Sequence, residues 1–105
     1  MGTLYYAATE RVAIPIPDRA LAHLRFVMVN KLRRKEPFTF SWDKSEDESG
    51  ARGSVWISPE IPLEFEFDDA ASVELNREWL EQLSMAASTT SGLVLIPEPA
   101  GTPAP

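Results

Sequence analysis

Between residues 38 and 67 the chain repeatedly alternates apolar and polar side chains. In the stretch 63–68, LEFEFD, three large apolar side chains alternate with Glu64 and Glu66, and the stretch 38–42, FTFSW, follows the same rule. Successive side chains of a strand point to opposite faces, so this period of two predicts strands with one buried and one solvated face. Such strands are typical of mostly antiparallel sheets that are covered on one side.

Two more strands are expected before this region, over residues 3–9 and 11–17. The second contains Pro15 and Pro17, which have no N–H group to donate to a neighbouring strand. We therefore expect the strand over 11–17 to lie at an edge of the sheet or to end there.

A helix is predicted over residues 18–36, with Asp18 as its N-cap and Pro37 ending it. At about 100° per residue its core stripe consists of four apolar side chains: Leu21, Leu24, Met28 and Leu32. His23, the only histidine, projects almost opposite this stripe and is expected at the surface.

A second helix is predicted after Asn76, which has the side chain of an N-cap, and a last strand follows Gly92. The element order is therefore β-β-α-β-β-β-α-β. This order predicts an α+β fold, a mostly antiparallel sheet with both helices packed on one face. We expect one domain over 1–97, a polar hairpin loop near 43–53, and a flexible Pro/Ala-rich tail over 98–105.

Composition narrows the function classes. The chain has no cysteine and a net charge of -6, which excludes thiolate metal sites and opposes nucleic-acid binding at long range. No apolar run reaches the roughly 20 residues of a membrane helix, and no secretion signal begins the chain. We therefore expect a cytoplasmic protein without membrane partners, and no cofactor is predicted.

Catalytic motifs are missing from the sequence, including the G-x-S-x-G elbow and glycine-rich phosphate loops. An enzyme is therefore not expected. The carboxylates Glu64, Glu66 and Asp68 share one strand face and could together hold a divalent cation. A solvated acidic face is the default interpretation, because a metal site needs ligands from several elements.

The first helix ends in a basic cluster, NKLRRKE, that stands out in an acidic chain. In the structural explanation its cations only suit the negative end of the helix dipole, and Phe26 is tucked under a neighbouring strand. Phe26 projects away from the core stripe on the side of Arg33, and Trp56 points away from the buried face of its strand. Aromatic and arginine side chains dominate interaction hot spots, so Phe26, Arg33, Arg34 and Trp56 are the predicted partner-binding residues.

Six stretches of the chain carry a resemblance to known proteins: MGTLYY, DRALAHLRFVMVNKLRR, FTFSW, SVWISPEIPLEFEF, LNREWLEQLSMAAS and GLVLIPEP. In these stretches the chain resembles a family of small uncharacterised actinobacterial proteins of about a hundred residues. Family members are often labelled as ATP-dependent DNA ligases. No lysine of this chain stands in the K-x-D-G motif that ligases use, so the resemblance implies at most an accessory role near DNA repair.

Three functions therefore remain open. The first is a non-enzymatic protein-interaction module, which could bind a protein partner or self-associate as a homo-oligomer. The second is a nucleic-acid-associated accessory factor, which requires the arginines and lysines of the first helix and Arg52 to converge on one surface. The third is a small divalent-metal-binding protein or enzyme.

Overall fold

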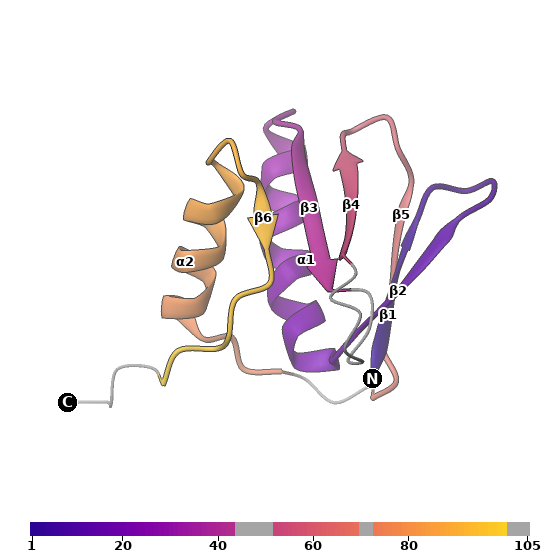
Figure 1. Cartoon of the computed structure of the whole chain (residues 1–105). Helices are drawn as coiled ribbons and strands as arrows, with labels where there is room; N and C mark the ends of the chain where they lie inside the picture. Colours follow the sequence, from indigo (N-terminus) through magenta and orange to yellow (C-terminus); the bar gives the residue numbers. More distant parts are fainter. Residues whose placement is uncertain (44–51, 70–72, 101–105) are drawn as a thin grey trace.

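The computed structural model describes residues 1–43, 52–69 and 73–100 (Figure 1). Most of the predicted polar hairpin loop, residues 44–51, and the end of the predicted tail, residues 101–105, lie outside the described residues. The observed element order is β-β-α-β-β-β-α-β, and the α+β class is confirmed.

The six strands form two three-stranded sheets. The first sheet has the order β2-β1-β5, all antiparallel, with these bounds: β1 Gly2–Tyr6, β2 Val12–Ile16 and β5 Leu63–Glu66. The second has the order β4-β3-β6, in which β6 runs parallel to β3, with these bounds: β3 Phe38–Asp43, β4 Arg52–Ile57 and β6 Leu93–Val94. The proline-containing strand β2 lies at an edge, as predicted.

The alternating pattern suggested a single sheet, whereas the structure divides the strands between two sheets. The sheets meet where β5 follows β4 along the chain (Figure 1). There the Tyr6 hydroxyl of β1 donates a hydrogen bond to the backbone carbonyl of Trp56 in β4. A side chain therefore joins the two sheets at a place where the backbone ladder does not continue from β4 to β5.

Helix α1 spans Asp18–Arg33 and helix α2 spans Arg77–Ala87. In Figure 1, α1 lies behind β3 and α2 lies beside β6. The predicted core stripe is confirmed for Leu21, Leu24 and Met28, which are fully buried, whereas Leu32 is only partly buried against the core. Neither helix of the described residues is long and apolar enough to cross a membrane.

The two helices begin differently. Asn76 caps α2 as predicted, since its Oδ1 accepts the backbone N–H groups of Glu78 at 3.0 Å and Trp79 at 3.3 Å. The prediction that Asp18 caps α1 is wrong, because Pro17 occupies the N-cap position and makes no side-chain cap. Instead the Asp18 carboxylate accepts the backbone N–H groups of Asp68 at 3.2 Å and its neighbour in sequence at 2.9 Å. The Asp18 carboxylate therefore accepts N–H groups from a segment distant in sequence and not those of its own helix.

Candidate functional site

Phe26, in the middle of α1, is a large apolar side chain that is 44% exposed. Residues three, four and seven positions apart share one side of a helix, so Ala22, Phe26, Val29 and Arg33 form a stripe along α1. Neither Ala22 nor Val29 is fully buried. The sequence prediction that the core stripe leaves Phe26 uncovered agrees with this exposure.

One side of Phe26 borders a shallow hollow between α1 and α2. The apolar part of its lining is formed by Phe26, Leu80 and Met85, and Met85 is 72% exposed. Arg77 and Glu81 of α2 form its charged rim.

The other side of Phe26 borders a second hollow, between α1 and the segment that precedes α2. Its apolar lining includes Phe67, Val73 and Leu75, and Leu75 is 40% exposed. Arg25 and Asp69 are its charged lining residues. Phe26 is therefore the ridge between two hollows. We call the two hollows, together with Arg33 at the end of the α1 stripe, the Phe26 surface.

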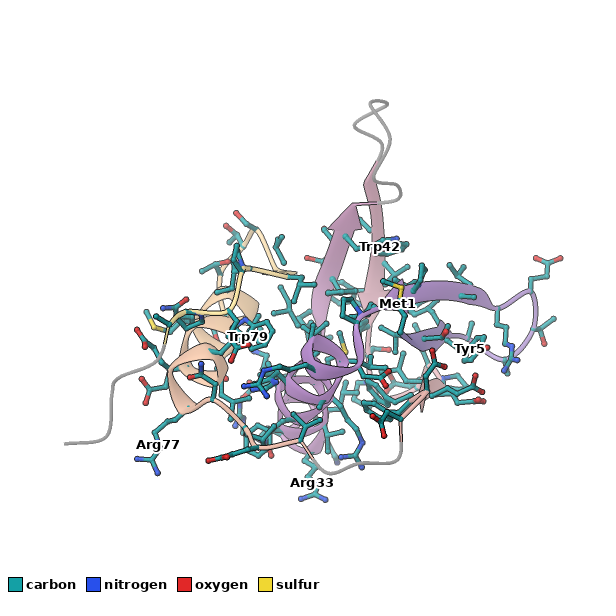
Figure 2. All side chains as sticks on the ribbon, turned by 90° about the horizontal axis from the view of Figure 1, so that it is seen from below. Met1, Tyr5, Arg33, Trp42, Arg77 and Trp79 are labelled. Atoms are coloured by element: carbon teal, nitrogen blue, oxygen red, sulfur yellow. The ribbon has the colours of Figure 1, made fainter. Side chains whose placement is uncertain are left out.

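Three arginines border the Phe26 surface. Arg25, Arg33 and Arg77 form no ion pair within the part of the chain that the structure describes. In Figure 2, Arg33 and Arg77 both project from the helical side of the molecule, away from the sheets. The helical side thus combines exposed apolar area with three arginines outside any ion pair of the described residues and with the carboxylates of Glu81 and Asp69, which line the two hollows.

The rest of the basic cluster serves the end of α1. Lys31 is only 7% exposed and its Nζ lies 3.2 Å from Glu36 Oε1, while Arg34 Nε lies 3.2 Å from Glu36 Oε2. Hydrogen bonds from Arg34 and Lys31 lower the pKa of the Glu36 carboxyl. Of the cluster residues predicted to bind a partner, Arg34 is therefore engaged within its own chain and Arg33 is not.

The backbone at the C-terminal end of α1 adopts a defined capping geometry. Lys35 has a φ of 58°, and its N–H donates to the carbonyl of Leu32 while the N–H of Glu36 donates to that of Lys31. This is the Schellman arrangement, which normally places glycine at the left-handed position.

Trp56, the fourth predicted binding residue, is 53% exposed on β4. It lines two hollows near the end of α1, both of them with Pro37 and one also with Pro59, and neither hollow includes Phe26. The structure therefore does not bring Trp56 and Phe26 together.

His23 is fully buried, so the prediction of a surface histidine is wrong. Its Nδ1 lies 2.8 Å from the Arg19 carbonyl, and its Nε2 accepts the backbone N–H of Asn76 at 2.8 Å. Because Nε2 is an acceptor, the proton is assigned to Nδ1, which donates to Arg19. The ring also packs on Trp79, with centroids 4.4 Å apart. The start of α2 covers a side of α1 that the helical projection alone places in solvent.

A second set of contacts extends from this buried histidine to the C-terminal segment. Arg19 donates to both carboxylate oxygens of Glu98 at 2.7 Å, and Asn76 Nδ2 donates to the same carboxylate at 3.0 Å. These two donors lower the pKa of Glu98 to about 2. Trp79 Nε1 donates to the carbonyl of Ile96 at 3.0 Å. No pattern in the sequence indicates this arrangement, because Glu98 stands in a proline-rich stretch predicted to be a tail.

The carboxylates predicted as weak metal ligands have other neighbours. Glu64 Oε1 lies 3.3 Å from Arg11, and Asp68 Oδ2 lies 2.8 Å from the N-terminal amine of Met1. No group of three potential metal ligands occurs among the described residues.

The cations that a nucleic-acid-binding surface would require pair with carboxylates of the same chain at separate places. Arg19 pairs with Glu98, and both Lys31 and Arg34 pair with Glu36. These pairs face different parts of the molecule, because Arg19 lies in the first turn of α1 and Arg34 follows its last. The predicted single phosphate-binding surface is not formed by these three residues.

Comparison with known proteins places the chain in a family. Residues 1–98 match the family model described as a domain of unknown function, DUF7882, and the chain belongs to that family. The expected membership of a family without an assigned activity is thereby confirmed. No curated protein and no solved structure matches the chain.

Proposed function

We propose that this protein is a non-enzymatic interaction module that binds a protein partner through the Phe26 surface. The observation that carries the proposal is the exposed ring of Phe26 between two apolar hollows on the helical side. Exposed aromatic side chains bordered by apolar pockets are typical anchors of protein interfaces, where a few residues supply most of the binding free energy.

The surrounding residues support the same interpretation. Met85 and Leu75 extend the exposed apolar area on either side of Phe26. Arg25, Arg33 and Arg77 lie around this area, and arginine is enriched at interfaces because its guanidinium forms several directed hydrogen bonds. An apolar centre with a charged rim is the usual anatomy of a protein–protein interface.

The alternative of nucleic-acid binding receives less support from the geometry. Arg19, Lys31 and Arg34 each pair with a carboxylate of the same chain, and the chain carries a net charge of -6. A phosphate would have to displace these carboxylates to reach the cations, which weakens the electrostatic term that dominates such binding.

The test compares two substitutions of exposed apolar residues. Phe26→Glu alters the Phe26 surface, and Val12→Glu alters β2, where Val12 is 41% exposed and Phe26 is 44% exposed. Each variant and the wild type would carry one photo-crosslinker at the same surface position near Met85 and would be expressed in the native host. Cross-linked partners would be identified by mass spectrometry after nuclease treatment.

We expect a protein partner that cross-links to the wild type and to Val12→Glu but is lost with Phe26→Glu. Thermal unfolding of all three proteins checks that the substitutions leave the fold intact. A cross-linking pattern that is identical in all three, from folded proteins, would contradict the proposal. If the only partner is a second copy of this chain, the interaction is self-association.

A further inference from the structure

We propose that the element bound by the Phe26 surface is an acidic amphipathic helix of the partner protein. This inference rests on the proposed function, because it identifies the chemistry of the partner at the same surface. Two observations carry it: the shape of the surface along the helices and the sign of its unpaired charges.

The shape favours a helix. The hollow between α1 and α2 and the hollow between α1 and the preceding segment lie on either side of Phe26. An amphipathic helix offers apolar side chains at positions i, i+3, i+4 and i+7, so one partner helix can place anchors on both sides of a central ridge. The 16 residues of α1 make a helix about 24 Å long, and a partner helix of similar length could lie along it.

The charges favour carboxylates on that helix. The only carboxylate of α1 is Asp18, and it is occupied by backbone N–H groups of the segment after β5. The cations Arg25 and Arg33 of α1 have no ion-pair partner within the described chain. Arg77 of α2 adds little to this charge, because it lines a hollow with Glu74, Glu78 and Glu81. Glutamate or aspartate side chains beside the partner's apolar stripe would pair with Arg25 and Arg33, and charge-assisted pairs with arginine can be bidentate.

The remaining charge on the surface favours a protein over an anionic bilayer. Glu81 lines the hollow that contains Met85, and Asp69 lines the hollow that contains Leu75. A uniformly anionic membrane would meet both carboxylates with like charge, whereas a helix can place a neutral or basic residue opposite each of them. Mixed charge around an apolar centre therefore fits a patterned partner.

The experiment uses two synthetic 18-residue peptides with the same leucine and phenylalanine positions on one helical face. The positions that flank this face on one side are glutamate in the first peptide and lysine in the second, and all other positions are glutamine in both. Binding of each labelled peptide to the full chain is measured by fluorescence anisotropy, at low and high salt. We expect the glutamate peptide to bind about tenfold more tightly than the lysine peptide, with the difference reduced at high salt.

Substitutions then locate the site. Phe26→Ala should weaken both peptides about tenfold, because it removes the shared apolar anchor. Arg25→Glu with Arg33→Glu should reverse the preference, so that the lysine peptide becomes the tighter ligand. Val12→Ala is the control, and it should change neither affinity.

Several results would overturn the inference. These are equal binding of the two peptides, binding of neither, or an unchanged preference in the arginine variant. Binding to vesicles of phosphatidylglycerol but not to the glutamate peptide would assign the surface to lipid instead. If the peptides fail while Phe26→Glu still abolishes cross-linking to a protein, the proposed function stands and only this inference is wrong. If cross-linking is also unaffected, both are wrong.

Discussion

The two ends of α1 carry similar basic residues and use them in different ways. At the first turn, Arg19 binds Glu98, 79 positions away in the sequence, and His23 accepts the N–H of Asn76, 53 positions away. Just after the last turn, Arg34 binds Glu36, two positions away. Figure 1 shows the consequence, because the C-terminal segment passes the start of α2 on its way out of the fold.

The start of α1 is held by contacts with segments distant in sequence, whereas its end is held by contacts with neighbouring residues. Contacts at the start of α1 connect three segments that lie far apart in sequence, so their loss changes how these segments pack. Contacts at the end of α1 close the helix within a few residues, so their loss affects a single turn. Arg33 belongs to neither group, which leaves it available at the Phe26 surface.

The largest effect is expected from His23→Ala, which breaks the joint at the start of α1. The substitution removes a fully buried ring that packs on Trp79 and leaves the Asn76 N–H without its acceptor. Loss of buried volume and of this hydrogen bond should lower the free energy of unfolding by about 3 kcal/mol. Urea denaturation at neutral pH measures the change.

Arg25→Ala provides the control for this variant, because it changes an exposed residue two positions along the same helix. We expect a change within about 0.5 kcal/mol for that substitution. Similar stabilities for His23→Ala and wild type would mean that the histidine does not hold the helices together.

A smaller change in the free energy of unfolding, in this case an increase, is expected from a substitution at the other end of α1. Lys35 adopts a φ of 58°, a left-handed conformation that costs a side-chain-bearing residue roughly 1 kcal/mol. Lys35→Gly should remove this cost, and the greater entropy of glycine in the unfolded chain should offset part of the gain. We expect a net stabilisation of about 0.5 kcal/mol in urea denaturation. Lys35→Ala keeps the Cβ atom and should not reproduce it.

The smallest effect is expected from Glu98→Gln, because the ion pair with Arg19 lies at the surface. The pKa of Glu98 is lowered from its usual 4.5 to about 2, so the folded state favours the ionised carboxylate. Its contribution to stability is therefore present above pH 4.5 and is lost as the pH falls toward 2.

Thermal melting across this pH range tests the sign. The variant should melt below the wild type at neutral pH, and the difference should shrink as the solution is acidified through this window. A difference that persists unchanged at pH 2.5 would show that the carboxylate charge is not what stabilises the C-terminal segment.

Sequence reasoning recovered the features that depend on neighbouring residues. The alternating strands, the core stripe of α1 and the Asn76 cap follow from periodicity and local hydrogen bonding, and all three are observed. The same reasoning indicated that the core stripe leaves Phe26 uncovered and that Trp56 points away from the buried strand face. It left open whether a neighbouring strand covers Phe26, and Phe26 is 44% exposed.

Tertiary structure decided the positions that another element does cover. The helical projection places His23 opposite the core stripe, where a surface residue is expected, yet the start of α2 buries it. Asp18 has the side chain of a cap, yet the segment after β5 supplies its donors.

By itself, the sequence determined which elements form and which faces of them are apolar, because these properties depend on residues a few positions apart. Only the tertiary structure decided that Glu98 would bind Arg19, that the strands would divide into two sheets, and that two hollows would flank Phe26. The physical reason is that these features depend on how separate elements pack. Packing depends on the complementary shapes of these elements and on hydrogen-bond partners that are distant in the chain. A local sequence pattern contains no information about either.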